Sequence, residues 1–338
     1  MAELHHGGRL REAASCYGIP PGQWLDLSTG INPVGWPVPP LPAACWQRLP
    51  EADDGLERAA AEHYGAVHLL PVAGSQAAIQ ALPLLRPAGR VGVLAPSYAE
   101  HAAAWQRQGH ELVALEAGAI PHLLPGLDVL LLVNPNNPTG MAFSPEQLLA
   151  WHAALAARGG WLVVDEAFMD ATPERSMARY AGVPGLIVLR SLGKFFGLAG
   201  ARVGFALAWP QLLRELAALL GPWTVSGPAR EAARLALADR AWQAETRQRL
   251  LQQGERLQVL LARHGLASAG GTALFRYCPT AQAAALHEAL ARQGILTRLF
   301  EAPAALRFGL PGDEAAWRRL ERALSALPVN ATQKVAKC

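Results

Sequence analysis

Lysine is almost absent from this sequence. Among the 30 basic residues of the 338-residue chain, only Lys194, Lys334 and Lys337 are lysines. A general preference for arginine explains the missing lysines, but it does not explain why Lys194 remains. A lysine amine can lose its proton and attack a carbonyl group, which a guanidinium cannot do. We therefore expect Lys194 to take part in chemistry rather than to be a solvated surface residue.

Other absences exclude several classes of protein. The four cysteines are far apart and form neither a CxxC pair nor a disulfide framework, which is typical of a reducing compartment: Cys16, Cys45, Cys278 and Cys338. No residue is assigned to a metal. The N-terminal residues have no apolar signal core, and runs such as 129–133 are far too short to span a membrane. We therefore expect a cytoplasmic protein that binds no membrane.

The net charge of +3 does not indicate a nucleic-acid partner. It comes from scattered arginines, with no block of basic residues and no aromatic residues between them. With 51% hydrophobic residues and a length of 338, the chain can form about two domains. The Pro- and Gly-rich start predicts an irregular, extended arm that must pack on the rest. We expect the following parts: an N-terminal arm at 1–45 that closes the active site, a large domain at 46–239, an interdomain helix at 240–264, a small C-terminal domain at 265–328 and a flexible tail at 329–338.

The large domain shows alternating short apolar runs and helical patterns. Such a pattern predicts an α/β fold with a mostly parallel sheet covered by helices. We expect strands at 90–95, 111–115, 129–133, 161–164 and 186–190, with helices ending near 64, starting after 76, and spanning 98–108 and 145–157. The small α/β domain should contain strands at 273–277, 295–298 and 305–310, and helices at 281–292 and 314–324.

Four segments at strand ends or helix starts offer groups that suit one cofactor, because open α/β sheets bind ligands there. Lys194 offers an amine for a Schiff base, and Asp165 offers a carboxylate that keeps a pyridine nitrogen protonated. Gly74-Ser75-Gln76 opens a helix and suits a phosphate, with Arg202 as countercharge. Asn137 can donate to a ring oxygen. Each segment alone also fits an ordinary cap or turn, but together they indicate pyridoxal phosphate.

The order of these motifs is similar to that of a known family. The motifs resemble those of the fold type I pyridoxal phosphate enzymes of the aspartate aminotransferase superfamily. In chain order they are Gly-Ser-Gln, Tyr98, Asn-Pro-Asn-Asn-Pro-Thr-Gly, Asp-Glu-Ala and Ser-Leu-Gly-Lys-Phe-Phe-Gly-Leu-Ala-Gly-Ala-Arg-Val-Gly. The resemblance implies a large domain with a parallel sheet and a smaller α/β domain. One position departs from the family: Phe168 stands where a tyrosine often donates to the ring oxygen.

The resemblance also implies a role for each matching residue. Lys194, Asp165 and Tyr98 would be catalytic: Lys194 binds the cofactor, Asp165 pairs with the pyridinium and Tyr98 stacks on the ring. The resemblance assigns the remaining contacts as follows: Ser75, Gln76, Ser191 and Arg202 to the cofactor phosphate, Asn137 to the ring oxygen and the substrate, Arg307 to the substrate carboxylate, and Tyr64 to the cofactor phosphate of a neighbouring subunit. The last assignment implies a homodimer.

The N-terminal arm narrows the choice within the superfamily. His6-Gly7-Gly8 and the segment 25–33, Leu-Asp-Leu-Ser-Thr-Gly-Ile-Asn-Pro, resemble the L-threonine O-3-phosphate decarboxylases of cobalamin biosynthesis, which are close to the histidinol-phosphate aminotransferases. This implies decarboxylation to (R)-1-amino-2-propanol O-phosphate and CO2. It also implies a second anion site for the substrate phosphate, formed by His6, Gly7, Asn32 and Arg298.

Two alternatives stay open at this point. A histidinol-phosphate aminotransferase would share every motif of the cofactor site, and the release of CO2 or the formation of glutamate from 2-oxoglutarate would separate the two. A non-catalytic pyridoxal phosphate module is the other alternative. Such modules usually bring a DNA-binding domain, for which the region before residue 56 has no room.

Overall fold

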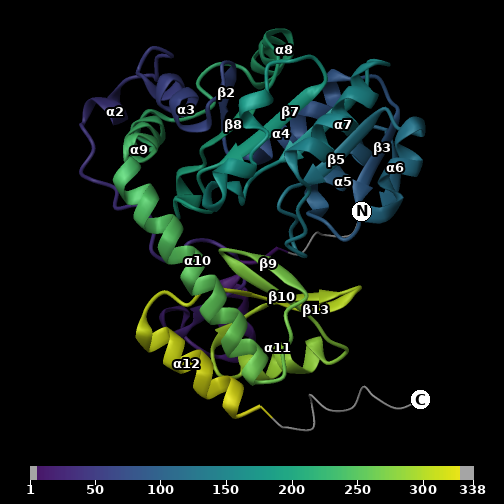
Figure 1. Ribbon diagram of the computed structural model, residues 1–338. Helices are drawn as coiled ribbons and strands as arrows, with labels where there is room; N and C mark the ends of the chain where they lie inside the picture. The colour runs from purple at the N-terminus through teal and green to yellow at the C-terminus, as the bar shows by residue number, and fades with distance from the viewer. Residues whose placement is uncertain (1–5, 328–338) are drawn as a thin grey trace. The chain divides into compact units, whose positions relative to one another are not determined.

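The computed structural model describes residues 6–327, and the chain forms two compact units (Figure 1). The large unit contains residues 35–137 and 141–247. The small unit contains, among the described residues, 6–34, 138–140 and 248–327. The boundary between them falls inside the long helix α10 (Arg240–Arg263). The tail expected at 329–338, with Lys334, Lys337 and Cys338, lies outside the described residues.

The large unit is built on a seven-stranded sheet with the order β2-β8-β7-β6-β5-β3-β4. All neighbours pair in parallel except β8, which is antiparallel to both β2 and β7. The expectation of a mostly parallel sheet is therefore confirmed. The strands are β2 (Leu69–Val72), β3 (Arg90–Leu94), β4 (Glu111–Leu115), β5 (Val129–Val133), β6 (Trp161–Asp165), β7 (Leu186–Ser191) and β8 (Gly204–Leu207).

Helices cover both faces of this sheet. On one face, alternate strand residues such as Leu131 and Val163 pack against α4, α5 and α8. The residues between them, such as Leu130 and Leu162, are also fully buried, and α7 contacts β6. Continuous apolar strands are typical of a sheet enclosed between helical layers. The helices are α2 (Ala44–Gln47), α3 (Leu56–Tyr64), α4 (Ser75–Ala81), α5 (Ala99–Arg107), α6 (Ile120–Leu123), α7 (Pro145–Ala156), α8 (Pro210–Leu220) and α9 (Gly227–Ala238).

The small unit contains an antiparallel sheet with the order β12-β13-β10-β9 and a separate parallel pair, β1-β11. This pair joins the N-terminal residues to the C-terminal part of the chain, and the apolar side of α1 packs on the same region. The elements are α1 (Leu10–Tyr17), β1 (Leu25–Asp26), β9 (Gly270–Thr272), β10 (Phe275–Pro279), α11 (Ala283–Ala291), β11 (Ile295–Leu296), β12 (Arg298–Glu301), β13 (Ala304–Gly309) and α12 (Glu314–Ser325).

The structure corrects two expectations about the chain and adds elements that the sequence did not indicate. Residues 1–45 were expected to be an irregular, extended arm, but α1 is a regular helix and residues up to Val34 belong to the small unit. The strand expected at 295–298 is interrupted at Thr297, because its two halves pair with different strands, β1 and β13. The short strands β2 and β8 and the helices α8 and α9 were not predicted. Within residues 6–327, no helix is long and apolar enough to cross a membrane.

Candidate active site

Two strand ends of the large unit carry the residues predicted to react with a cofactor. Asp165 is the last residue of β6, and Lys194 follows the end of β7. Because β6 and β7 are parallel neighbours, both residues leave the sheet at the same edge. Lys194 Nζ lies 5.5 Å from the centre of the ring of Phe168, and Phe168 follows Asp165 by three residues in the chain. The structure thus brings the segments of the predicted amine and carboxylate together.

The Asp165 carboxylate is held in place on both oxygens. One oxygen lies 2.8 Å from Nε2 of His101, and the other accepts a hydrogen bond from the backbone N–H of Ala167 at 3.0 Å. Asp165 is 2% exposed and His101 is 1% exposed, so water does not compete for these contacts. With its proton on Nε2, His101 donates to the carboxylate and fixes the direction in which it points.

His101 is a functional candidate that the sequence reasoning missed. It lies on α5, three residues after Tyr98, and the two rings are 6.0 Å apart in an edge-on arrangement. Residues three apart on a helix lie on the same face. That spacing is the sequence feature that could have pointed to His101.

A cradle for an anion lies where α4 and β8 begin. A Cβ atom on Gly74 would lie 2.7 Å from Nη2 of Arg202, and one on Gly204 would lie 2.5 Å from the backbone nitrogen of Ser75. Only glycine allows such close approach. Arg202 has a φ of 54°, in the left-handed region that few arginines adopt, and Ser191 pairs with Gly204 at the same sheet edge. A guanidinium, two hydroxyls and backbone N–H groups are suitable donors for a phosphate, so these residues fit pyridoxal phosphate.

Gln76, predicted to bind the same phosphate, has other partners in this structure. Its Nε2 donates to Glu100 at 2.8 Å, and its Oε1 accepts a hydrogen bond from the Tyr98 hydroxyl at 3.3 Å. Burial, together with the nearby carboxylates of Glu100 and Asp165, raises the pKa of Tyr98 to about 12. The hydroxyl therefore remains protonated at neutral pH. Gln76 orients Tyr98, and a direct contact of Gln76 with phosphate stays a prediction.

The loop that carries Asn137 is tied to the start of α5. Asn136 accepts a hydrogen bond from the Ser97 hydroxyl at 2.9 Å and donates to the carbonyl of Pro96 at 2.9 Å. Asn137 directly follows Asn136 in the chain, and Tyr98 directly follows Ser97. Their backbones are therefore close, as binding to one cofactor ring would require.

Tyr64 does not fit its predicted role. Leu56, Ala60 and Tyr64 form the buried face of α3, and Tyr64 is 8% exposed. Its ring packs 4.6 Å from the guanidinium carbon of Arg190, and burial is the main cause that raises the pKa of its hydroxyl. A hydroxyl that reaches a neighbouring subunit has to lie at the surface. The helical spacing of these three residues explains why Tyr64 points into its own unit instead.

Arg190 is the centre of a buried ionic cluster, also missed from the sequence. It lies in β7 just before Ser191 and is 1% exposed. Its guanidinium binds Glu166 at 2.7 Å and also Asp170, and both carboxylates are fully buried. The cluster therefore joins the end of β7 to the segment after β6. In the described part of the chain, no group of His, Cys, Asp and Glu residues is arranged to hold a metal ion.

The small unit holds two of the predicted substrate-binding residues side by side. Arg298 and Arg307 are directly opposite each other in the β12-β13 pair. Like charges in this position destabilise each other. Burial and the charge of Arg298 lower the pKa of Arg307 to about 9, and burial also lowers the pKa of Arg298. An anion bound here would offset the repulsion, so the pair suits an acidic ligand.

The segment with His6 and Gly7 lies against the same region of the small unit. The backbone N–H of Gly8 donates to the Ser28 hydroxyl at 2.8 Å, and a Cβ atom on Gly7 would lie 2.4 Å from the Ser28 carbonyl oxygen. That carbonyl accepts a hydrogen bond from Arg307 Nη2 at 2.6 Å. The backbone of residues 7 and 8 is therefore fixed beside the arginine pair.

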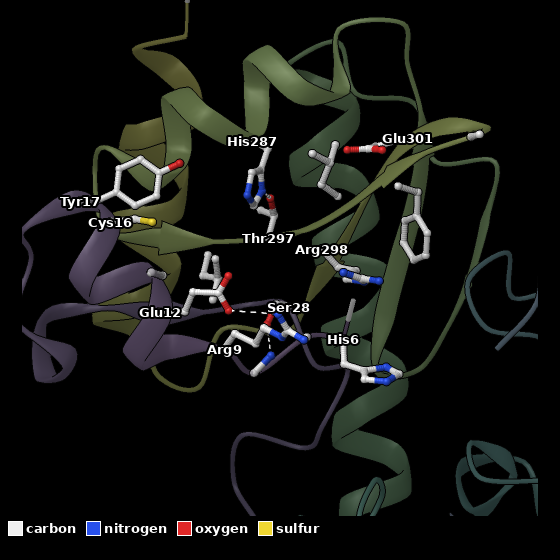
Figure 2. A pocket seen from close by; sticks show the side chains of 17 residues that line it. His6, Arg9, Glu12, Cys16, Tyr17, Ser28, His287, Thr297, Arg298 and Glu301 are labelled. Atoms are coloured by element: carbon white, nitrogen blue, oxygen red, sulfur yellow. Dashed lines mark hydrogen bonds and ion pairs between the residues drawn. The ribbon is translucent and has the colours of Figure 1, made fainter. Parts of the chain in front are cut away.

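A pocket of about 460 Å³ opens beside this segment (Figure 2). His6, Gly7 and Arg298 line it, so the structure brings three of the predicted phosphate-binding residues together. Asn32, the fourth, is not among the lining residues. It is buried and its Oδ1 accepts a hydrogen bond from the backbone N–H of Val34 at 3.1 Å, as in a turn. A role of Asn32 in substrate binding is therefore not supported by this pocket.

Comparison with known proteins identifies the family of this chain. The pattern of the family described as aminotransferase class I and II matches residues 49–324. The chain is 61% identical over 321 residues to a threonine-phosphate decarboxylase of Pseudomonas aeruginosa, covering 95% of this chain and 97% of that protein. It is 44% identical to a threonine-phosphate decarboxylase of a Sinorhizobium species, covering 96% and 99%.

A solved structure shows the same fold. The histidinol-phosphate aminotransferase of Sinorhizobium meliloti in complex with pyridoxal-5'-phosphate superimposes with a TM-score of 0.81, covering 99% of this chain and 96% of that one at 20% identity. At this identity the likeness concerns the fold alone. The family pattern and the two nearly full-length relatives settle the affiliation: the chain belongs to the aminotransferase class I and II family, and within it to the threonine-phosphate decarboxylases.

Proposed function

We propose that this protein decarboxylates L-threonine O-3-phosphate to (R)-1-amino-2-propanol O-phosphate and CO2, as a step of cobalamin biosynthesis. The observation that carries the proposal is the pair of opposed arginines, Arg298 and Arg307, beside the His6-Gly7 segment of the small unit. A substrate with both a carboxylate and a phosphate offers two anionic groups for this region. The relative with 61% identity is named for such a substrate.

The residues of the large unit fit pyridoxal phosphate as the cofactor. When bound, this group supplies an electron sink that stabilises the charge left at the substrate Cα when a bond to Cα breaks. Lys194 would hold its aldehyde carbon, Asp165 would face its ring nitrogen, and Tyr98 would cover its ring. The donors for its phosphate and ring oxygen would be Ser75, Ser191, Arg202 and Asn137.

The protein chooses the reaction by orienting the substrate. Arg307 would bind the carboxylate, while Arg298, His6 and the Gly7 backbone would bind the phosphate. With both anionic ends held, these residues would determine which bond to Cα is presented to the cofactor for cleavage. Positioning of this kind contributes up to about 7–11 kcal/mol in favourable cases. Because His101 holds Asp165, the carboxylate would keep its direction toward the ring nitrogen of a bound cofactor.

A direct assay tests the proposal. Purified protein supplied with pyridoxal phosphate should release CO2 from L-threonine O-3-phosphate, and Lys194→Ala should release none. L-Threonine should be a very poor substrate, because it lacks the phosphate. Formation of glutamate from 2-oxoglutarate without CO2 release would instead assign the protein to the histidinol-phosphate aminotransferases.

We also propose a homodimer in the cytoplasm. Large apolar side chains are exposed on the large unit, among them Trp46, Leu49 and Trp223, and such residues suit burial against a second copy. Cys16, Cys45 and Cys278 are all free thiols, which supports a reducing compartment. Light scattering coupled to gel filtration measures the dimer, and a monomer at micromolar concentration would refute it.

A further inference from the structure

The pocket in Figure 2 has an additional cation that the phosphate site described above leaves unused. Arg9 lines it together with His6 and Arg298. Figure 2 shows the Arg9 side chain pointing into the pocket near Ser28, with Arg298 on the opposite wall. Three groups that bind phosphate well thus converge on one cavity from two separate segments of the chain.

The position of Arg9 is fixed by the local structure. It follows Gly8, whose N–H is bound to Ser28, and it is the residue that precedes α1. The backbone on its other side continues directly into that helix. The backbone of Arg9 is therefore held in place on both sides. Its side chain is 33% exposed and remains accessible to a ligand.

The charges around Arg9 favour an anion in the pocket. Burial lowers the pKa of Arg298, and the positive charge of Arg9 lowers it further. The carboxylate of Glu12 lies 3.2 Å from Arg9, but this ion pair is largely exposed to solvent. Exposed pairs contribute little, so a bound dianion can compete with Glu12 for Arg9. An anion that contacts Arg9 and Arg298 would relieve the repulsion between them.

We propose that Arg9 determines specificity for the substrate phosphate by binding it together with Arg298. This inference rests on the proposed function and adds a residue to its phosphate site. A phosphate dianion carries two negative charges and three terminal oxygens that accept hydrogen bonds, so a second guanidinium matches both its charge and its acceptors. Among the residues assigned to the substrate phosphate above, only Arg298 carries a guanidinium, and it matches one of the two charges.

The test compares Arg9→Gln with Arg11→Gln, since Arg11 is an exposed arginine two residues further along, in α1. Arg9→Gln should lower kcat/KM for L-threonine O-3-phosphate by about 10- to 150-fold, the value of one charge-assisted hydrogen bond. The effect should appear mainly in KM. Activity on L-threonine and the visible absorption of the bound cofactor should stay unchanged. Arg9→Lys should recover part of the loss, and Arg11→Gln should equal wild type.

Two results would overturn the inference. One is a KM for the phosphorylated substrate that is the same in Arg9→Gln and Arg11→Gln. The other is an equal loss with phosphorylated and unphosphorylated threonine, which would indicate a structural role. Calorimetric titration of the cofactor-bound protein with inorganic phosphate separates this inference from the proposed function. If wild type releases no CO2, weaker phosphate binding by Arg9→Gln still supports the site, and unchanged binding refutes it.

Discussion

Arg190→Leu is expected to destabilise the large unit strongly. Leucine removes the cation that neutralises Glu166 and Asp170, and both carboxylates are fully buried. Removal of one partner of a buried ion pair costs about 3–5 kcal/mol. Because two carboxylates depend on Arg190, we expect about 5 kcal/mol. For a unit of this size, each kcal/mol lowers Tm by about 2–4 °C, so Tm should fall by about 10–20 °C.

The pH dependence of this loss provides a sharper test. In wild type, burial would raise the pKa of Asp170, but Arg190 and His63 together outweigh burial and lower that pKa. Burial already raises the pKa of Glu166 in spite of Arg190. Without the arginine, burial is opposed less at both carboxyl groups, and we expect both folded pKa values to rise above the unfolded value of about 4.

A folded pKa above the unfolded pKa gives stability that is complete below the unfolded pKa and is lost as the pH rises through the folded pKa. The variant should therefore lose stability as the pH rises. Wild type should lose less stability as the pH rises, because the folded pKa of its Asp170 lies below the unfolded value rather than above it. The difference in the free energy of unfolding should shrink as the pH falls from about 8 to about 5.

Urea unfolding followed by tryptophan fluorescence at several pH values measures both effects. Arg234→Leu is the matched control, because it removes an arginine from a partly exposed pair with Glu231 on α9. Such a pair contributes at most about 1 kcal/mol. The reasoning would be refuted by a loss in Arg190→Leu no larger than in this control, or by a large loss that does not change with pH.

Three further variants test the site. Borohydride reduction should attach the cofactor to the one peptide with Lys194, and Lys194→Ala should lose the visible absorption of lysine-bound cofactor; label at Lys334 or Lys337 would contradict the assignment. Asp165→Asn should bind cofactor but turn over more than about 100-fold more slowly, and near-normal turnover would mean that another group protonates the ring. Arg298→Ala should lower kcat/KM for L-threonine O-3-phosphate at least about tenfold with unchanged absorption. An unchanged preference over L-threonine would place the phosphate site elsewhere.

The sequence predicts the large unit well where strands are long and apolar. The runs at 129–133 and 161–164 and the helix at 145–157 match β5, β6 and α7 within a residue. The capping box of Ser144 and Gln147 marks the start of that helix. β2 and β8 are only four residues long, and β2 contains Pro71, so neither shows a clear pattern.

The N-terminal segment was harder to predict because its composition conceals its structure. Prolines and glycines across residues 1–45 suggest an irregular chain, yet the eight residues of α1 include no proline or glycine. The pairing of β1 with β11 involves two residues on each side. Contacts this short and this distant in sequence leave no periodic pattern, so only the folded chain shows them.

Some residues of the candidate site could be predicted from the sequence, and others could not. Lys194 and Asp165 could be found because their motifs follow strand ends. His101 and Arg190 act through partners distant in sequence, and those pairings cannot be seen in any local pattern, although the spacing from Tyr98 places His101 on the same helix face. Tyr64 was assigned from its motif, although its helical face places its hydroxyl inside the unit. A motif specifies the residue type, while the direction of the side chain depends on packing.

The pairing of Leu25 with Ile295 has a consequence for synthesis of the protein on the ribosome. The residues of the large unit emerge in between and can complete their sheet, while the first 34 residues still lack most of their unit. At about 5–20 residues per second, the interval between synthesis of Leu25 and synthesis of Ile295 lasts roughly 15–55 seconds. During that time Leu10, Ala14 and Tyr17 have no Ala291 or Leu296 to pack against. The pocket between α1 and β12 therefore forms only when the end of the chain has been made, and the nascent N-terminus is the segment that chaperones would have to shield.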